Sequence, residues 1–249
     1  MPRPPLLLLP PSEGKAPGGR PAGRPDSFAA DLEVHRAPVR TALARTVSGR
    51  GAARRMAVLG VRGELLDRAV EATAALAAGT APVLPAWRRC TGVVWGGLDP
   101  ATLAPADRRR VLVPSALYGM TTAADPVVDY RLKMLVTLDG PGRLSTYWRP
   151  HLTAALARRA RGRLVIDLLP AEHGHALDPA VLDRSTRLVR VRFVGPDGRR
   201  AVGHEAKAAK GRLARVLLDA GLDGVDGFDA DGWRAGLRDD VVTVVAPVR

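Results

Sequence analysis

Three short segments of the chain carry residue types that bind phosphate groups and other oxyanions. The first segment, Ser12-Glu13-Gly14-Lys15, follows an apolar run at Leu6 to Leu9 that predicts a buried strand. At the carboxyl end of a strand, a hydroxyl, exposed backbone N–H groups and an ammonium can converge on an anion. The segment is not a Walker motif, because Ala16 stands where that motif requires Ser or Thr after its lysine. The alternative is a proline-rich turn with an exposed lysine.

The second segment is Tyr130-Arg131-Leu132-Lys133-Met134. In a strand, Tyr130, Leu132 and Met134 would share one face, and Arg131 and Lys133 would share the other. Two cations side by side on a sheet repel each other, so this pattern favours an anionic partner. The alternative is a solvated polar face, which costs little in water.

The third segment, Lys207 to Arg215, predicts a helix. Lys207 and Lys210 are one turn apart, Gly211 would allow a phosphate to approach the backbone, and Arg212 lies at the edge of the same surface. The alternative is an ordinary amphipathic helix that buries its leucines and exposes its cations.

The composition gives the lysines in these segments particular weight. The chain has 249 residues, a formal net charge of +13 and no Asn or Gln, and only four of its 38 basic residues are lysines: Lys15, Lys133, Lys207 and Lys210. In a chain that uses arginine as its general cation, a retained lysine suggests a constrained position, since the two side chains are not interchangeable. The hydrophobic fraction of 46% excludes disorder of the whole chain. With one cysteine, Cys90, the chain can form neither an internal disulfide nor a cysteine-based metal cluster.

Other candidate sites have weaker support. Glu172, His173 and His175 could offer metal ligands, but two histidines and one carboxylate without a supporting cluster favour ordinary loop residues, and we predict no metal or cofactor. Ser115 lacks the glycines of a nucleophile elbow, so nothing supports a hydrolase. No apolar run is long enough to span a bilayer, and we expect a cytoplasmic protein with no membrane or obligate protein partner.

Strand and helix signals interleave without strict alternation, which favours a mixed α/β sheet surrounded by helices in one domain, 1–249. Residues 11–25 form a predicted Pro/Gly-rich loop. Leu59 to Glu64 resembles the turn of a helix-hairpin-helix element, with a plain tight turn as the alternative. We expect Pro38 to break or kink the first helix. The predicted strands are 6–9, 92–95, 111–115, 129–137, 164–168, 188–194, 200–204 and 241–245, and the predicted helices are 26–47, 64–78, 101–110, 145–161 and 206–220.

Several segments together resemble a known family. They are Leu8-Leu9-Pro10-Pro11 with Ser12 to Lys15, Thr91 to Leu98, Val113 to Gly119, Tyr130 to Met134, Tyr147-Trp148, Lys207 to Arg215 and Asp226-Gly227-Phe228. Their order and spacing are similar to those of the peroxide stress protein YaaA family, which is widespread in bacteria. The chain departs from the family pattern at Asp167 to His173, where relatives carry an Asn-Leu-Ala-Ser-type stretch.

This resemblance implies a family-specific mixed α/β fold, DNA binding in a positively charged cleft, and protection against iron-dependent DNA damage during hydrogen peroxide stress. On the matching residues, we expect Ser12 and the six cations Lys15, Arg131, Lys133, Lys207, Lys210 and Arg212 to contact phosphates beside Gly211, with Trp148, Tyr130 or Tyr118 stacking on an unpaired base. The lack of Asn and Gln removes the usual adenine readers and predicts weak sequence selectivity. The alternative is an enzyme for a phosphorylated or nucleobase substrate, with Lys15 or Lys133 as nucleophile or base and Ser12 or Glu172 assisting. A third hypothesis is a metal-handling protein that uses His173, His175 and Glu172.

Overall fold

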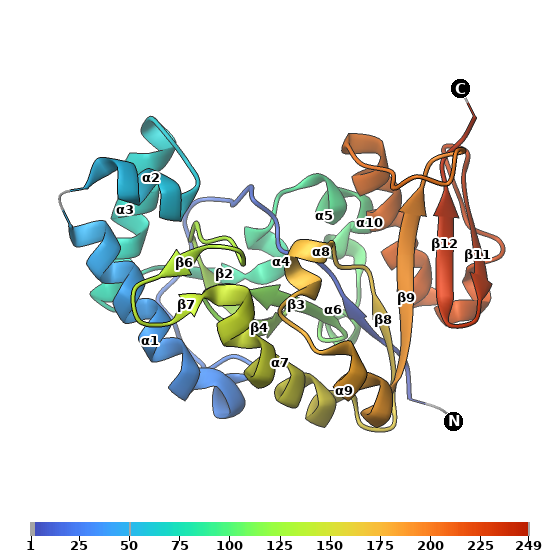
Figure 1. The fold of residues 1–249 in the computed structure, drawn as a ribbon, viewed down its shortest axis with the longest axis horizontal. Helices are drawn as coiled ribbons and strands as arrows, with labels where there is room; N and C mark the ends of the chain where they lie inside the picture. The colour runs from blue at the N-terminus through green and yellow to red at the C-terminus, as the bar shows by residue number, and fades with distance from the viewer. Residues whose placement is uncertain (1–2, 50, 249) are drawn as a thin grey trace.

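A mixed eight-stranded sheet organises the computed structural model, which describes residues 3–49 and 51–248 (Figure 1). The strand order is β10-β11-β12-β9-β8-β1-β3-β4. The five strands from β12 to β3 run parallel, and β4, β11 and β10 are antiparallel to their neighbours. The strands of the sheet are β1 (Leu6–Leu8), β3 (Val111–Ser115), β4 (Gly119–Thr122), β8 (Leu164–Asp167), β9 (Arg187–Val194), β10 (Asp229–Ala230), β11 (Trp233–Arg238) and β12 (Val241–Val245).

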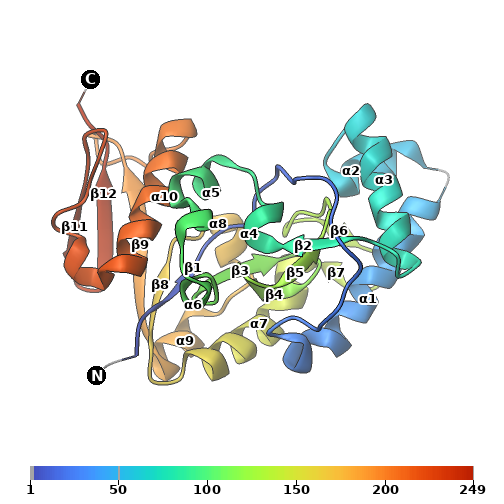
Figure 2. The ribbon, with the colours of Figure 1, turned by 180° about the vertical axis from the view of Figure 1, so that it is seen from behind.

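Helices cover both faces of this sheet. In Figure 1, α7 (Leu144–Ala160) and α9 (Pro179–Ser185) lie in front of it, and in Figure 2, α5 (Val93–Leu98) and α10 (His204–Asp219) lie in front. The first strand shows why both faces are apolar: Leu6 and Leu8 enter one hydrophobic core, and Leu7 and Leu9 enter the other. The remaining elements are α1 (Ala29–Ser48), α2 (Ala52–Leu59), α3 (Glu64–Ala77), α4 (Ala86–Arg89), α6 (Pro105–Arg108), α8 (Ala171–Gly174), the 3-10 helices η1 (Pro100–Thr102) and η2 (Gly221–Gly224), and two small pairs, β2 (Val83–Pro85) with β5 (Pro126–Val128) and β6 (Thr137–Leu138) with β7 (Gly142–Arg143).

The fold class and most central elements confirm the sequence-based expectation. Strands β1, β3, β8, β9 and β12 and helices α1, α3, α7 and α10 lie within a few residues of their predicted ranges. The ends of the predicted domain, residues 1 and 249, lie outside the described residues. No helix in the described part of the chain combines the length and the apolar composition needed to cross a bilayer.

Three predicted strands are wrong. Residues 92–95 begin helix α5 instead, because this apolar run packs on α10. Residues 129–137 are mostly irregular, although the alternation survives: Tyr130, Leu132 and Met134 are buried, whereas Lys133 is exposed. Residues 200–204 contribute only one bridge, between Val194 and Arg200, because α10 already begins at His204.

Two helix predictions also need correction. Pro38 lies inside the continuous helix α1, and the carbonyl that its missing N–H leaves free belongs to Val34, which is 74% exposed and open to water. The helix predicted at 101–110 is divided into η1 and α6, and α6 starts at Pro105, in the first-turn position that proline favours.

Helices α5 and α10 pack so closely that their glycines are required. A Cβ on Gly97 would lie 2.6 Å from the carbonyl oxygen of Ala208, and a Cβ on Gly211 would overlap the carbonyl oxygen of Val94. The space beside Gly211 is therefore filled by α5. This helix packing replaces the open phosphate approach that the sequence predicted for this glycine.

We expect Gly211→Ala to lower the free energy of unfolding by about 1–3 kcal/mol, because the added methyl group meets backbone that cannot move away easily. Gly96→Ala in α5 is the matched control, since no atom lies within 4 Å of the added Cβ there. That variant should gain up to about 1 kcal/mol from helix propensity. Urea denaturation measures the free energy of unfolding of both variants. If the two substitutions changed it in the same direction, the result would contradict the close packing of α5 on α10.

Candidate functional site

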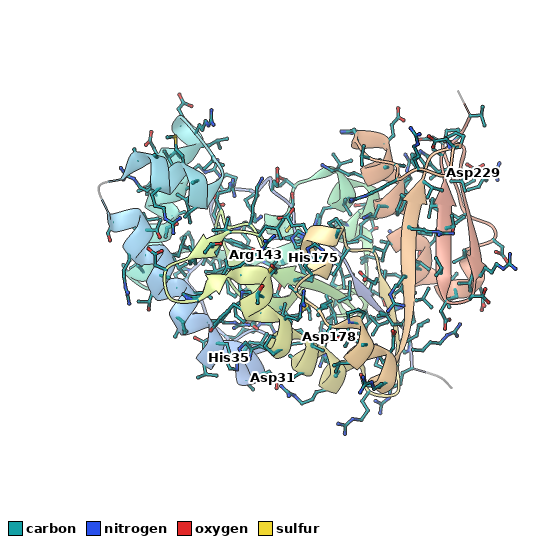
Figure 3. The ribbon with its side chains drawn as sticks, in the orientation of Figure 1. Asp31, His35, Arg143, His175, Asp178 and Asp229 are labelled. Atoms are coloured by element: carbon teal, nitrogen blue, oxygen red, sulfur yellow. The ribbon has the colours of Figure 1, made fainter. Side chains whose placement is uncertain are left out.

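Polar side chains gather at the carboxyl ends of β1 and β8, which lie side by side and run parallel. Strand β1 is flanked by β3 on one side and by β8 on the other, so the chain changes direction across the sheet at this point. Such switch points are where open α/β sheets bind ligands. Helices α2 and α3 stand on one side of this edge, and α5 and α10 stand on the other (Figures 1 and 2). His175, labelled in Figure 3, directly follows α8 in the loop after β8.

The loop after β1 places a hydroxyl without a partner at this edge. Ser12 is only 7% exposed, and its buried Oγ atom has no hydrogen-bond partner among the described residues. A Cβ on Gly92 would overlap this Oγ, so the hydroxyl packs closely against the glycine, and a larger residue at position 92 would displace it. A buried hydroxyl in this state is unusual, because burial of an unpaired polar group costs free energy.

Lys15 enters the same region from the end of the loop. Its Nζ donates to the carbonyl oxygen of Ser12 and lies 4.9 Å from the centre of the Tyr130 ring. Burial lowers the pKa of Lys15, and the charge of Arg131 lowers it further, while Cys90 and Asp129 oppose the shift. A backbone bridge to Cys90 fixes this part of the loop.

A buried guanidinium holds the proline- and glycine-rich segment against the body of the protein. Arg89 is 0% exposed and donates to the carbonyl oxygens of Ala16, Gly18 (2.9 Å), Pro82 (3.0 Å) and Val127 (3.4 Å). These bonds begin one residue after Lys15. They therefore hold the lysine at the sheet edge.

Lys210 reaches the same edge from helix α10. Its Nζ donates to the carbonyl oxygen of Leu168 at 2.7 Å and lies 5.3 Å from the centre of the Phe193 ring. Burial lowers the pKa of Lys210 to about 8, although the nearby carboxyl of Asp167 opposes this shift. Burial also raises the pKa of Asp167, whose carboxylate accepts a 2.8 Å hydrogen bond from the backbone of Leu169.

His173, in α8, lies within the electrostatic influence of both lysines. Its Nδ1 atom is buried without a partner among the described residues. Burial lowers the pKa of His173 to about 4, and the charges of Lys210 and Lys15 contribute to the shift. The imidazole is therefore neutral at pH 7. The pairing of β1 with β8 brings the loops after these two strands to the same edge of the sheet, and Lys210 of α10 contacts Leu168 there.

The remaining predicted phosphate-binding cations are either paired with carboxylates or exposed. Arg131 forms a 2.8 Å ion pair with Asp129, and Arg212 forms one of 2.5 Å with Asp231. Lys133 is exposed beside Glu13, with an Nζ–Oε1 distance of 3.2 Å, and Lys207 is exposed on α10. The structure thus separates two partly buried lysines without a salt bridge, Lys15 and Lys210, from exposed or paired cations.

The aromatic residues expected to stack on a base belong to the interior. Trp148 is 0% exposed, and its Nε1 donates to the carbonyl oxygen of Ala116 at 2.8 Å. The hydroxyl of Tyr130 is 2.7 Å from the Ser115 hydroxyl, and that of Tyr118 accepts from the Val128 N–H at 3.1 Å. Burial raises the pKa of Tyr130 and of Tyr118. Trp148 and Tyr130 are buried, and Tyr118 is partly buried against the same core, so the expectation that Trp148 or Tyr130 offers an open stacking platform is wrong for this structure.

Helices α2 and α3 form a hairpin around the loop 60–63. Gly60 and Gly63 have φ angles of +68° and +56°, in the left-handed region that favours glycine. The backbone N–H groups of Val61, Arg62 and Gly63 have no partner among the hydrogen bonds of the described residues. The side chain of Lys133 lies against Gly60, since a Cβ there would be 3.3 Å from its Cε. Two helices joined by a short loop are therefore present, as both the helix-hairpin-helix hypothesis and the plain turn require, and a lysine lies next to the loop.

Sequence reasoning missed several members of the site. Arg89 and Asp167 carried no motif, and Cys90 was noted only as a single cysteine. His173 was weighed as a metal ligand, but no group of three or more His, Cys, Asp or Glu in the described part of the chain could hold a metal ion. The neighbouring ammonium groups also disfavour a cation beside this histidine. The one available signal was that His173 lies five residues after Leu168, the last residue of a predicted strand.

Comparisons with known proteins match most of the chain. A family model described as "Peroxide stress protein YaaA" matches residues 6–236. A UPF0246 protein of Streptomyces coelicolor is 36% identical over 222 residues, which cover 87% of this chain and 84% of that protein. UPF0246 proteins of Corynebacterium efficiens and Corynebacterium glutamicum are 34% and 35% identical, and each match covers 85% of this chain and 84% of the relative.

The lowered pKa of His173 predicts a specific acid sensitivity. Its pKa is 6.5 when unperturbed and about 4 in the folded protein, so the unfolded chain binds an extra proton between these values. Stability is therefore lost as the pH falls from about 6.5 to 4. The free energy of unfolding should fall less over this pH range in His173→Gln than in the unmodified protein, by on the order of 2 kcal/mol. Urea denaturation at several pH values measures this difference. His175→Gln, in the same loop but exposed, should behave like the unmodified protein; an equal response of both variants would contradict the assignment.

Proposed function

Because this chain belongs to the peroxide stress protein YaaA family, we propose that it binds DNA during hydrogen peroxide stress and thereby limits iron-dependent DNA damage. The α2–α3 hairpin and its neighbouring cations would contact the phosphates. The observation that carries the proposal is the hairpin loop 60–63, with its unpartnered N–H groups, next to the exposed ammonium of Lys133.

The loop has the chemistry of a phosphate contact. Three successive N–H groups, from Val61 to Gly63, precede the first turn of α3, and N–H groups at a helix N-terminus attract anions. Arg62 is exposed in the same loop, and Lys133 lies against Gly60. The exposed Lys207 of α10 would extend the contact on the other side of the sheet edge.

Acidic residues near the loop set a limit on affinity. Glu64 and Asp67 lie in the first turn of α3, and Glu13 is paired with Lys133. A phosphate would have to displace Glu13 and lie near Glu64. The proposal therefore requires moderate binding that depends strongly on salt, because exposed charges are screened.

Backbone N–H groups and lysines contact phosphates without reading bases. The chain has no Asn or Gln, the side chains that most often read adenine. The proposed surface therefore binds DNA with little sequence preference.

Binding of this kind would limit iron-dependent damage through displacement of counterions. Fe²⁺ associates with DNA phosphates as a counterion, and cationic side chains that contact phosphates release such ions. Hydroxyl radicals are too reactive to diffuse far, so moving Fe²⁺ off the duplex moves the damage away from it.

We expect a labelled duplex to bind with a steep salt dependence between about 50 and 200 mM salt, measured by fluorescence anisotropy. Lys133→Ala and Arg62→Ala should each lower the slope of log K against log salt by about one and weaken binding several-fold, whatever the sequence of the duplex. Glu64→Gln should strengthen binding, because it removes a negative charge from the contact surface.

Arg238→Ala is the matched control. The side chain of Arg238 is 94% exposed on β11, and its substitution removes the same positive charge. If Arg238→Ala weakened duplex binding as much as Lys133→Ala does, total charge, and not the hairpin, would determine the affinity. No binding at the lower salt concentration would overturn the proposed function.

The displacement argument predicts protection in a purified system. In a plasmid nicking assay with Fe²⁺ and hydrogen peroxide, added protein should reduce strand breaks in proportion to the DNA it occupies. Lys133→Ala, at equal concentration, should protect less, and the protection should be lost at a salt concentration that releases the protein. Equal protection by the variant under conditions where it is unbound would contradict the displacement mechanism.

A further inference from the structure

We propose that the carboxyl edge of β1 and β8 contains a second site, distinct from the hairpin, that binds a phosphate monoester group through Ser12, Lys15, His173 and Lys210. The established family membership does not assign a ligand to these residues, and the DNA-binding proposal does not use them. The inference rests on their convergence and on the polar atoms that they leave unsatisfied.

Two buried atoms at this edge lack partners. The Oγ of Ser12 and the Nδ1 of His173 are both inaccessible to solvent and form no hydrogen bond in the described part of the chain. They come from the loops after two adjacent parallel strands, where Leu8 pairs with Asp167. A bound oxyanion would accept hydrogen bonds from both, because a hydroxyl can donate and a neutral imidazole carries one N–H.

The two lysines have unused donor capacity. An ammonium carries three N–H donors, and each of these lysines makes one hydrogen bond in the structure, Lys15 to Ser12 O and Lys210 to Leu168 O. Neither forms a salt bridge within residues 3–49 and 51–248, although each is partly buried. Ammonium groups that leave water are normally paired, so two partly buried ones without a carboxylate partner indicate a place for an anion.

Nearby acidic groups do not fill this role. Asp129 is bonded to Arg131 and Arg68, and Glu13 is paired with Lys133. Asp167 is the one carboxyl group of β8 next to Lys210, and its hydrogen bond is with the Leu169 N–H. Burial raises the pKa of Asp167, so its environment disfavours the charged form.

The burial of the site selects a terminal phosphate group. The bridging phosphates of an intact duplex lie along its surface and cannot approach a hydroxyl that is 7% exposed. A monoester projects from the end of its molecule, and at neutral pH it carries close to two negative charges, which match two ammonium groups. The same group occurs on small phosphorylated metabolites and at the 5′ ends of DNA strands.

The test is calorimetric titration of the purified protein in phosphate-free buffer at low ionic strength. The probes are inorganic phosphate, adenosine 5′-monophosphate, and one short oligonucleotide with and without a 5′-phosphate. We expect binding of the phosphate-bearing probes, weakened about tenfold or more by Lys210→Met and by Lys15→Met. Lys207→Met, one turn away and exposed on the same helix, should bind inorganic phosphate like the unmodified protein.

The probes distinguish the two sources of the group. Binding of the mononucleotide and of inorganic phosphate would indicate a small-molecule ligand, whereas a preference for the 5′-phosphorylated oligonucleotide would indicate a DNA end; both support the site. No binding of any probe at about 10 mM, or equal losses for Lys207→Met and Lys210→Met, would overturn it. The salt dependence of duplex binding should be unchanged in Lys210→Met, so failure here leaves the hairpin proposal intact.

A measurement on the unmodified protein covers the case in which the lysine variants fail to fold. The imidazole of His173 can be followed by ¹⁵N NMR, with its signal identified by its absence in His173→Gln. We expect saturating inorganic phosphate to raise the pKa of His173 from about 4 by at least about one unit, because the anion offsets the charges of Lys210 and Lys15. An unchanged pKa in the presence of phosphate would also overturn the proposal.

Discussion

The position of the candidate site depends on one buried guanidinium. Arg89 has no carboxylate partner among the described residues, and four carbonyl oxygens from three separate segments surround it instead. A guanidinium can serve in this way because its donors point in fixed directions and it stays protonated even when buried. The segment after Lys15 is rich in Pro and Gly and forms few regular backbone hydrogen bonds. The hydrogen bonds from the Arg89 side chain hold this segment in place of the backbone hydrogen bonds of a sheet. Together with the backbone bridge between Lys15 and Cys90, these bonds hold Lys15 at the sheet edge.

Burial around this anchor accounts for the electrostatics of the site. Lys15, Lys210 and His173 all have lowered pKa values, and burial is the first cause of each shift. These shifts mean that a positive charge on any of the three groups costs free energy in the folded protein, and a bound anion would reduce that cost. A polar cluster that destabilises the free protein and lies at the switch point of a parallel sheet is typical of a ligand site. The hairpin cations differ because they are exposed and contribute little to stability.

Sequence reasoning identified the central sheet but not the composition of the site. Strands β1, β3 and β8 are buried on both faces, so each appears as an apolar run without alternation. The run at 92–95 has the same appearance but forms a helix, since Gly97 and Gly211 allow α5 and α10 to approach, which is a tertiary effect. Likewise, the position of His173 near Lys15 follows from the pairing of β1 with β8, across more than 150 residues of sequence. Helical spacing alone could not show that Lys210 turns inward while Arg212 pairs with Asp231.

The retention of lysine in an arginine-rich chain has a structural reason at three of its four positions. At Lys15 and Lys210, a compact ammonium lies beside an aromatic ring and donates to a single carbonyl oxygen. A guanidinium differs in this position because it is a planar fork of five donors rather than a point charge. At Lys133, the stem packs against Gly60, where the chain turns through a left-handed conformation. Nothing in the structure explains the lysine at position 207, which is exposed on α10.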